Sequence, residues 1–145
     1  MPEPSGPSAG RVLLAEDDRE FRRLIAKTLR NDGYEVVEAD DGVALLEQYA
    51  SALLADGDLN DVFDLIVTDV RMPGWTGLTI LDGLRSAGCN TPAIVMTAFG
   101  SDALRAGASR LGAVVIDKPF DLDELRQAIF AQFGRRDSGV FIERE

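Results

Sequence analysis

The chain has 145 residues, 46% of them hydrophobic, and 25 acidic against 15 basic side chains give it a formal net charge of −10. This length suits one compact domain, and the acidic charge argues against direct nucleic-acid binding, which needs clustered Lys and Arg. The absence of histidine excludes Ser-His-Asp and Cys-His nucleophiles and the usual His-containing zinc sites. The lone Cys89 fits a reducing, cytoplasmic setting, and no apolar run is long enough for membrane insertion.

Five short apolar runs predict β-strands that are covered on both faces. In chain order they are 12–15, 34–38, 65–68, 93–96 and 114–116. Apolar residues at helical spacing predict a helix after each strand. The predicted helices run from Arg19 to the Asn31-Asp32-Gly33 segment, from Val43 to about Ala55, from a Thr76 cap through Leu84, from Ala103 to Leu111, and from an Asp121/Glu124 capping box through Phe133.

This alternation of strands and helices predicts an α/β fold, doubly wound from right-handed βαβ units on a parallel sheet with helices on both faces. The Pro-, Ser- and Gly-rich residues 1–10 are expected to be a disordered leader. The domain is expected to cover residues 11–133. The tail, 134–145, leaves no room for an output domain, and its apolar Val140-Phe141-Ile142 fits docking on a partner, packing on the domain or disorder equally well.

Polar side chains follow four of the predicted strands where each strand ends. Glu16 and Asp17 follow the first strand, Asp69 the third, Thr97 the fourth and Lys118 the fifth. Because the carboxyl ends of parallel strands share one edge of a sheet, these side chains are expected to meet there. Each residue alone has an ordinary explanation as a turn former, a solvated acid, a strand-end hydroxyl or a surface charge. Their joint occurrence in strand order favours a site.

The chemistry of this set favours phosphoryl transfer. Clustered carboxylates repel one another unless a cation compensates them, and both Mg²⁺ and Lys118 can do so. Positioning and charge neutralisation are the main demands of phosphoryl transfer, and a carboxylate can be its nucleophile. Asp69 lies at a strand end, where it is held rigidly and a phosphodonor can reach it.

At these motifs the sequence resembles the receiver domain of bacterial two-component response regulators, the family of the chemotaxis regulator. The similarity covers about Arg11 to Phe133, and it is carried by Glu16-Asp17, TDVRMPGWTG around Asp69, MTAFG with Thr97 and DKPF with Lys118. The resemblance implies a flavodoxin-like (βα)5 fold with strand order 2-1-3-4-5.

The resemblance also implies a role for each matching residue. Asp69 would be the phosphoacceptor, and Thr97 and Lys118 would contact the phosphoryl oxygens. Mg²⁺ would be held by Asp17 directly, by Glu16 through water, by Asp69 and by the backbone carbonyl of Arg71. The Lys118-Pro119 peptide would be cis. The donor would be a phosphohistidine on a sensor histidine kinase or a histidine phosphotransfer protein.

The sequence departs from the family pattern in its switch and hydrolysis positions. Val115 stands where an aromatic residue is usual, and the segment between Gly112 and Lys118 is one residue short. Arg71 and Phe99 occupy the two positions that commonly influence hydrolysis. We expect a long-lived phosphorylated form if Phe99 excludes water, and no effect if both side chains simply face solvent.

The segment around residues 52–64 is longer than the family norm. We expect an extended helix followed by an acidic loop. A calcium loop is disfavoured because Asp61 stands where glycine is needed and Val67 cannot supply the final bidentate carboxylate.

The leading functional interpretation is a stand-alone receiver that signals by altered affinity for a downstream protein or for a second copy of itself. The resemblance places the output face on the fourth helix, the fifth strand and the fifth helix. The alternative is a pseudo-receiver that acts as a phosphorylation-independent interaction module, which Val115 favours and the complete site disfavours. Two kinds of enzyme on the same fold are disfavoured. A flavin-binding protein would need a phosphate loop after the first strand, where the acidic residues would repel the phosphate. A phosphatase with an aspartate nucleophile usually has a second acid two residues after it, and Arg71 occupies that position.

Overall fold

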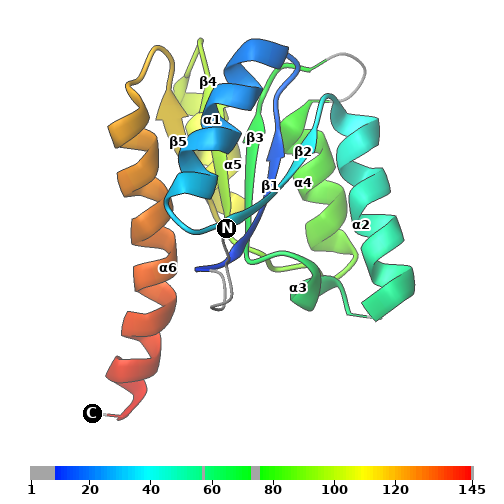
Figure 1. Ribbon diagram of the computed structural model, residues 1–145, viewed down its shortest axis with the longest axis vertical. Helices are drawn as coiled ribbons and strands as arrows, with labels where there is room; N and C mark the ends of the chain where they lie inside the picture. Colours follow the sequence, from blue (N-terminus) through cyan, green and yellow to red (C-terminus); the bar gives the residue numbers. More distant parts are fainter. Residues whose placement is uncertain (1–8, 57, 73–75, 145) are drawn as a thin grey trace.

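The computed structural model describes residues 9–56, 58–72 and 76–144, without the side chains of 52, 56 and 135–144 (Figure 1). The strands are β1 (Arg11–Ala15), β2 (Glu35–Ala39), β3 (Leu65–Asp69), β4 (Ala93–Thr97) and β5 (Ala113–Asp117). The helices are α1 (Arg19–Asn31), α2 (Gly42–Asp56), α3 (Leu59–Val62), α4 (Gly77–Ser86), α5 (Asp102–Arg110) and α6 (Leu122–Arg144). All paired strands are parallel, in the order β2-β1-β3-β4-β5, which confirms the predicted fold class.

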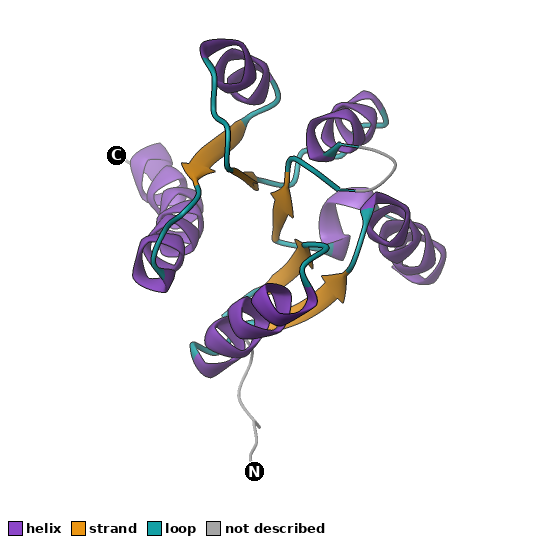
Figure 2. Ribbon diagram, turned by 90° about the horizontal axis from the view of Figure 1, so that it is seen from above, coloured by secondary structure: helices purple, strands orange, loops and turns teal. Residues whose placement is uncertain are grey.

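Helices cover both faces of the sheet, as Figure 2 shows, with α1 and α6 on one face and α2, α4 and α5 on the other. Successive residues of a strand point to opposite faces, so β1 contributes to both cores. Its Val12 and Leu14 pack with residues of α1 and α6, and Leu13 packs with residues of α2 and α4. The continuous apolar runs in the sequence reflect this burial on two sides.

The caps confirm the predicted starts of α4 and α6 and the predicted end of α1. The Thr76 hydroxyl accepts a hydrogen bond from the Thr79 N–H at 3.1 Å and starts α4. Asp121 and Glu124 form the expected reciprocal pair at the start of α6, with backbone-to-carboxylate distances of 2.8 and 3.1 Å. Gly33, with φ of +100°, follows α1 in a backbone conformation that suits glycine.

The predicted acidic loop after α2 contains a helical turn that the sequence did not indicate. α2 runs to Asp56, as expected of an extended helix, but residues 59–62 then form α3, which Asp58 caps. Asn60 fixes this turn to the α4–β4 connection: its amide donates to the Gly88 carbonyl at 3.1 Å and accepts from the Asn90 N–H at 2.7 Å. Four residues are too few to show helical periodicity in a sequence.

The described structure includes only part of the two ends of the domain. α6 continues without interruption from Leu122 past Phe133 to Arg144, so residues 134–144 extend the last helix. The predicted disordered leader falls mainly on residues 1–8, outside the described part, while the Ala9 N–H donates to the Gly33 carbonyl at 3.0 Å. Among the described residues, no helix combines the length and the apolar character needed to cross a bilayer.

Cys89 is fully buried under α2 and α3. Its thiol lies 3.3 Å from the Thr91 hydroxyl and 3.6 Å from the Tyr49 hydroxyl. Tyr49 also donates to Thr91, and burial raises the pKa of its phenol. This polar trio is satisfied internally and belongs to the core.

Candidate functional site

The predicted site residues meet at the carboxyl end of the sheet, at the top of Figure 1. Glu16 follows β1, Asp69 ends β3 and Thr97 ends β4, and only 1%, 6% and 4% of their surfaces are exposed. Parallel register places them at one level, since Ala15 pairs with Thr68 and Asp69 pairs with Met96. Burial among apolar strands holds these polar side chains in fixed positions.

Lys118 joins the acidic residues although it lies far from them in the chain. Its ammonium group donates to Asp69 Oδ2 at 2.5 Å and to Glu16 Oε1 at 3.1 Å. The Lys118 N–H also donates to the Thr97 carbonyl at 2.7 Å, which continues the pairing of β4 with β5 and sets the direction of the side chain. The Lys118-Pro119 peptide is cis, as the resemblance implied.

Three carboxylates can hold a metal ion at this end of the sheet. Glu16, Asp17 and Asp69 each offer an oxygen, and these oxygens lie within 4.8 Å of one another. The Arg71 N–H donates to Asp69 Oδ1 at 3.0 Å, so the Arg71 backbone lies beside the cluster. Asp17 is exposed and has no hydrogen bond to another described residue. A set of hard oxygen donors, one of them uncommitted, fits Mg²⁺.

Burial shifts the protonation equilibria of the site. It raises the pKa of Glu16 to about 7, against the opposing effects of the Asp18 N–H and of Lys118. Burial would lower the pKa of Lys118, but its hydrogen bonds to Asp69 and Glu16 outweigh this and raise it. The lysine therefore stays charged, and Glu16 is the carboxyl that changes charge near neutral pH.

Gly77 allows α4 to begin directly behind Asp69. A Cβ at this position would collide with the Asp69 carbonyl oxygen, and the Gly77 N–H donates to the Val70 carbonyl at 2.9 Å. The glycine of the TDVRMPGWTG motif thus permits the close approach of α4 to the end of β3.

Arg71 and Phe99 contact each other across the mouth of the site. The Arg71 guanidinium lies over the Phe99 ring, 5.0 Å from its centroid, and the ring remains 71% exposed. The Phe99 N–H donates to the Thr97 hydroxyl at 3.1 Å, which fixes the loop that carries the ring. Both side chains are in contact with solvent, but they also contact each other and are therefore not independent surface groups.

Sequence reasoning missed the aromatic side of the site. The ring centroids of Phe21 and Phe120 lie 5.8 Å apart, and the Lys118 ammonium lies 5.4 Å from the Phe21 centroid. A hollow of about 520 Å³ opens here beside the lysine, and it is lined by Asp18, Phe21, Ala98, Lys118, Pro119 and Phe120. The available signal was the position of Phe21 in the first turn of α1, directly after the acidic residues.

The shortened segment before Lys118 does not disturb the sheet. Gly112, with φ of +71°, leads straight into β5, and Val115 pairs with Val95 in unbroken register. Val115 is partly exposed on this edge strand.

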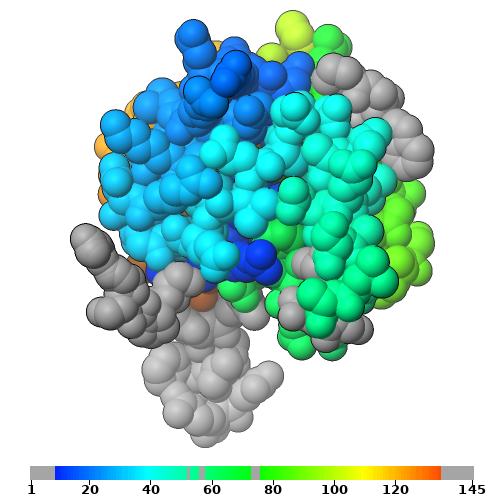
Figure 3. Space-filling model, turned by 45° about the vertical axis from the view of Figure 1, so that its right-hand side comes forward, coloured from blue at the N-terminus to red at the C-terminus, as the bar shows by residue number. Residues whose placement is uncertain are grey.

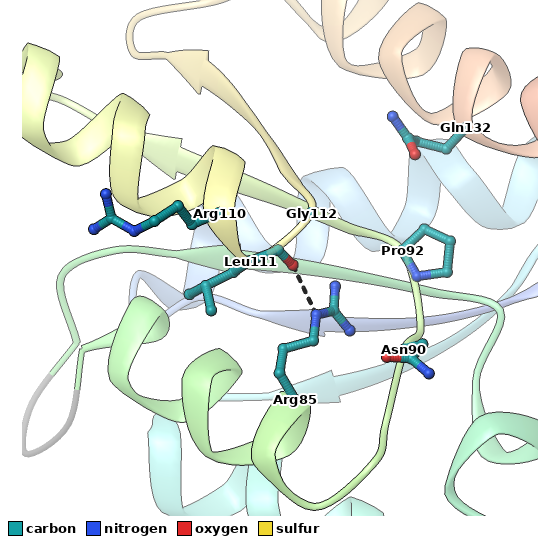
Figure 4. A pocket seen from close by; sticks show the side chains of 7 residues that line it. All are labelled: Arg85, Asn90, Pro92, Arg110, Leu111, Gly112 and Gln132. Carbon is teal, nitrogen blue, oxygen red and sulfur yellow. Dashed lines mark hydrogen bonds between the residues drawn. The ribbon is translucent and has the colours of Figure 1, made fainter.

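A hollow at the opposite end of the sheet lacks the features of a reactive site. It is lined by Arg85, Asn90, Pro92, Arg110, Leu111, Gly112 and Gln132 (Figure 4). Arg85 donates to the carbonyls of Leu111 and Cys89 at 2.7 and 3.0 Å, and Arg110 points away from Arg85. Arg85 therefore connects the end of α4 to the starts of β4 and β5, which is a structural role.

Comparison with known proteins agrees with this geometry. Residues 12–130 match the family described as the response regulator receiver domain. The response regulator MprA of Mycobacterium ulcerans is 39% identical over 116 residues, which are 79% of this chain and 46% of MprA. The response regulator protein PmrA of Pseudomonas aeruginosa is 40% identical over 130 residues, which are 89% of this chain and 54% of PmrA. The chain thus spans about half the length of these curated relatives.

The receiver domain of the Francisella response regulator 1452 superimposes with a TM-score of 0.74 at 28% identity, covering 88% of this chain and 98% of that one. Response regulator protein TrrA of Thermotoga maritima, solved in complex with Mg²⁺-BeF, superimposes with a TM-score of 0.67 at 28% identity. The match covers 84% of this chain and 97% of TrrA. The sheet order, the convergence of acids and lysine at its carboxyl end and the match over residues 12–130 lead to one conclusion: the chain belongs to the response regulator receiver domain family.

Proposed function

We propose that this receiver accepts a phosphoryl group on Asp69 and signals by a change in its affinity for other proteins. The observation that carries the proposal is the contact of Lys118 with Asp69 beside the Glu16 and Asp17 carboxylates. The site thus combines a rigidly held nucleophile, Asp69, with the fixed positive charge of Lys118 and a set of carboxylate oxygens that can bind a metal ion.

In the proposed reaction an Asp69 oxygen attacks the phosphorus of a phosphohistidine. The new O–P bond forms as the N–P bond breaks, and the imidazole leaves with the electron pair and takes up a proton. Lys118 and the Thr97 hydroxyl would hold the phosphoryl oxygens. Mg²⁺, held by Asp17, Asp69, the Arg71 carbonyl and, through water, Glu16, would neutralise charge on the transferring group. The chain would thus assist its own phosphorylation without being a classical enzyme.

The proposed donor is a sensor histidine kinase or a histidine phosphotransfer protein, as the family resemblance implies. The lack of histidine in this sequence agrees with a phosphohistidine on another protein. The proposed setting is the cytoplasm. The output would be altered binding to a downstream protein or to a second copy, since a phosphoryl group adds about −1.5 to −2 charge and three acceptor oxygens.

Phosphorylation by a small-molecule phosphodonor tests the acceptor. With acetyl phosphate and Mg²⁺, wild type should gain one acid-labile phosphate by intact-mass spectrometry, and Asp69→Asn should gain none. Asp117→Asn, which changes an exposed acid paired with Arg105 outside the site, should behave as wild type. Equal labelling of wild type and Asp69→Asn would overturn the assignment.

A beryllofluoride titration separates a working receiver from a pseudo-receiver. A functional site should bind this phosphoryl mimic only when Mg²⁺ is present, and Lys118→Ala should weaken the binding. If calorimetry detects no binding to the folded wild-type chain, the interaction-only alternative stands.

A further inference from the structure

The outer edge of β2 separates a basic helix, α1, from an acidic segment that includes α2 and α3. α1 carries five basic residues and one acidic residue, whereas Glu35 to Asp64 contains nine acidic residues and no basic one. Figure 3 shows this side of the molecule, with α1 in blue and β2, α2 and α3 in cyan to green. We call it the β2-edge surface: its basic half is Arg19, Arg23 and Lys27, and its acidic half is Asp40, Glu47, Asp58 and Asp61.

The basic half lies on the side of α1 that faces β2. Arg19, Arg23, Lys27 and Arg30 follow the spacing i, i+4, i+8 and i+11, which places them on one side of the helix. Arg30 donates to the Val36 carbonyl of β2 at 2.7 Å, which identifies that side. Arg19, Arg23 and Lys27 are exposed, and none forms an ion pair with another described residue.

The acidic half is equally uncompensated. Asp40, Glu47, Asp58 and Asp61 are exposed, and none has an ion pair among the described side chains. Asp58 uses its carboxylate to cap α3 and keeps its charge.

Exposed apolar side chains accompany these acids on α2. Val43, Glu47 and Leu54 share the outward face of the helix, and Val43 and Leu54 are 53% and 89% exposed. Exposed apolar side chains beside charged ones are common in protein-binding surfaces.

We propose that the β2-edge surface is a dimer interface in which α1 of one copy lies against α2 and α3 of a second copy. α1 and α2 lie on opposite faces of the sheet and both flank β2. A two-fold axis parallel to the strands, vertical in Figure 3, therefore brings the basic half of each copy opposite the acidic half of the other. The charge pattern is self-complementary about that axis, which identifies a second copy as the occupant.

In a dimer built about this axis, the Asp69 site of each copy remains accessible. It preserves the strand direction, so the carboxyl ends of both sheets point the same way. The interface excludes β5, the central strand of the output face that the family resemblance implies. Dimerisation at β2 and binding at the other edge are therefore geometrically compatible.

Ionic strength distinguishes this interface from general association. Two chains of net charge −10 repel each other, so association without local complementarity should strengthen as salt screens that repulsion. Attraction between opposed halves should instead weaken with salt. Sedimentation velocity of the full chain at about 0.01 M and about 1 M salt, where the Debye length is about 30 and about 3 Å, should show dimer only at the lower concentration.

A charge-swap experiment tests the pairing. Arg23→Glu with Lys27→Glu makes the basic half acidic, and Glu47→Lys with Asp61→Lys removes the net negative charge of the acidic half. Each double variant alone should dimerise roughly tenfold or more weakly than wild type. Their equimolar mixture should form a heterodimer, because the new acidic residues of one variant then face the new lysines of the other, and the unchanged halves face each other as in wild type. Restoration also shows that both variants are folded.

Asp82→Lys with Asp102→Lys is the matched control for Glu47→Lys with Asp61→Lys, since it makes the same change in net charge at exposed positions of α4 and α5. This control should dimerise at least as well as wild type. A wild-type monomer at both salt concentrations would overturn the proposal. Two doubles that fail to associate when mixed would also overturn it.

Discussion

At the scale of single residues, Glu16 and Lys118 set the charge balance of the site. Two of the three clustered carboxylates, Glu16 and Asp69, contact Lys118, and Glu16 is the most deeply buried of the three. Burial raises its pKa to about 7 in the metal-free protein, so Glu16 takes up a proton at neutral pH more readily than an ordinary glutamate does. A divalent cation favours the charged form and must compete with that proton.

Mg²⁺ binding should therefore weaken as the pH falls through about 7. The affinity should decrease by up to about tenfold per pH unit below that point, because binding releases the proton held by Glu16. Calorimetry over this pH range measures the effect. Glu16→Gln should bind Mg²⁺ more weakly but lose this part of the pH dependence, and an unchanged pH profile would exclude Glu16 as its source.

We predict that Phe99, through its contact with Arg71, slows hydrolysis of the proposed phosphorylated form. Phe99→Ala opens the mouth of the site to water and releases Arg71, so dephosphorylation should accelerate by roughly tenfold, or about 1.4 kcal/mol in the barrier. Loss of label from purified protein gives the rate. Phe130→Ala removes a comparably exposed ring, 72% against 71%, from α6 and should leave the rate unchanged. Equal rates for wild type and Phe99→Ala would favour independent, solvent-facing side chains.

At the scale of elements, prediction succeeded where the chain repeats one pattern over several residues. The five apolar runs became strands with bounds shifted by a residue or two, and the Thr76 and Asp121 caps start their helices as expected. α3 could not be predicted, because its position depends on hydrogen bonds between Asn60 and the distant residues Gly88 and Asn90. The Arg71–Phe99 and Lys118–Phe21 contacts were missed for the same reason: only the folded sheet brings these loops and helices together.

Asn60→Ala should loosen α3. It removes two hydrogen bonds to backbone groups, so the free energy of unfolding should fall by about 1–2 kcal/mol in urea denaturation. Asn90→Ala deletes an exposed amide and retains the backbone N–H that Asn60 binds, so it should cost less than about 0.5 kcal/mol. Equal losses for the two variants would show that α3 is held by apolar packing alone.

At the scale of the whole molecule, α6 is the element with two environments. Its first half places Leu125 and Ile129 in the core beside α1, and Phe133 stacks on Tyr34 with ring centroids 5.2 Å apart. Beyond Gly134 the helix continues away from the domain, toward the C-terminus at the bottom of Figure 1. The sequence located the change at about this point, since the helical apolar pattern stops at Phe133.

A chain that ends at Gly134 should therefore retain the domain. Its free energy of unfolding in urea should lie within about 1 kcal/mol of the full chain, and Mg²⁺-dependent labelling of Asp69 should persist. A chain that ends at Glu124 loses Leu125 and Ile129 from the core and should not fold. A large loss of stability on removing residues 135–145 alone would show that this segment packs on the domain.

The burial of Cys89 makes the protein convenient for spectroscopy. The only thiol of the chain is sealed under α2 and α3, where a labelling reagent cannot reach it in the folded state. One cysteine introduced at an exposed position would then accept a spin label or dye selectively, with no need to replace the native residue. Pairs of such labels on separate copies could report inter-subunit distances directly.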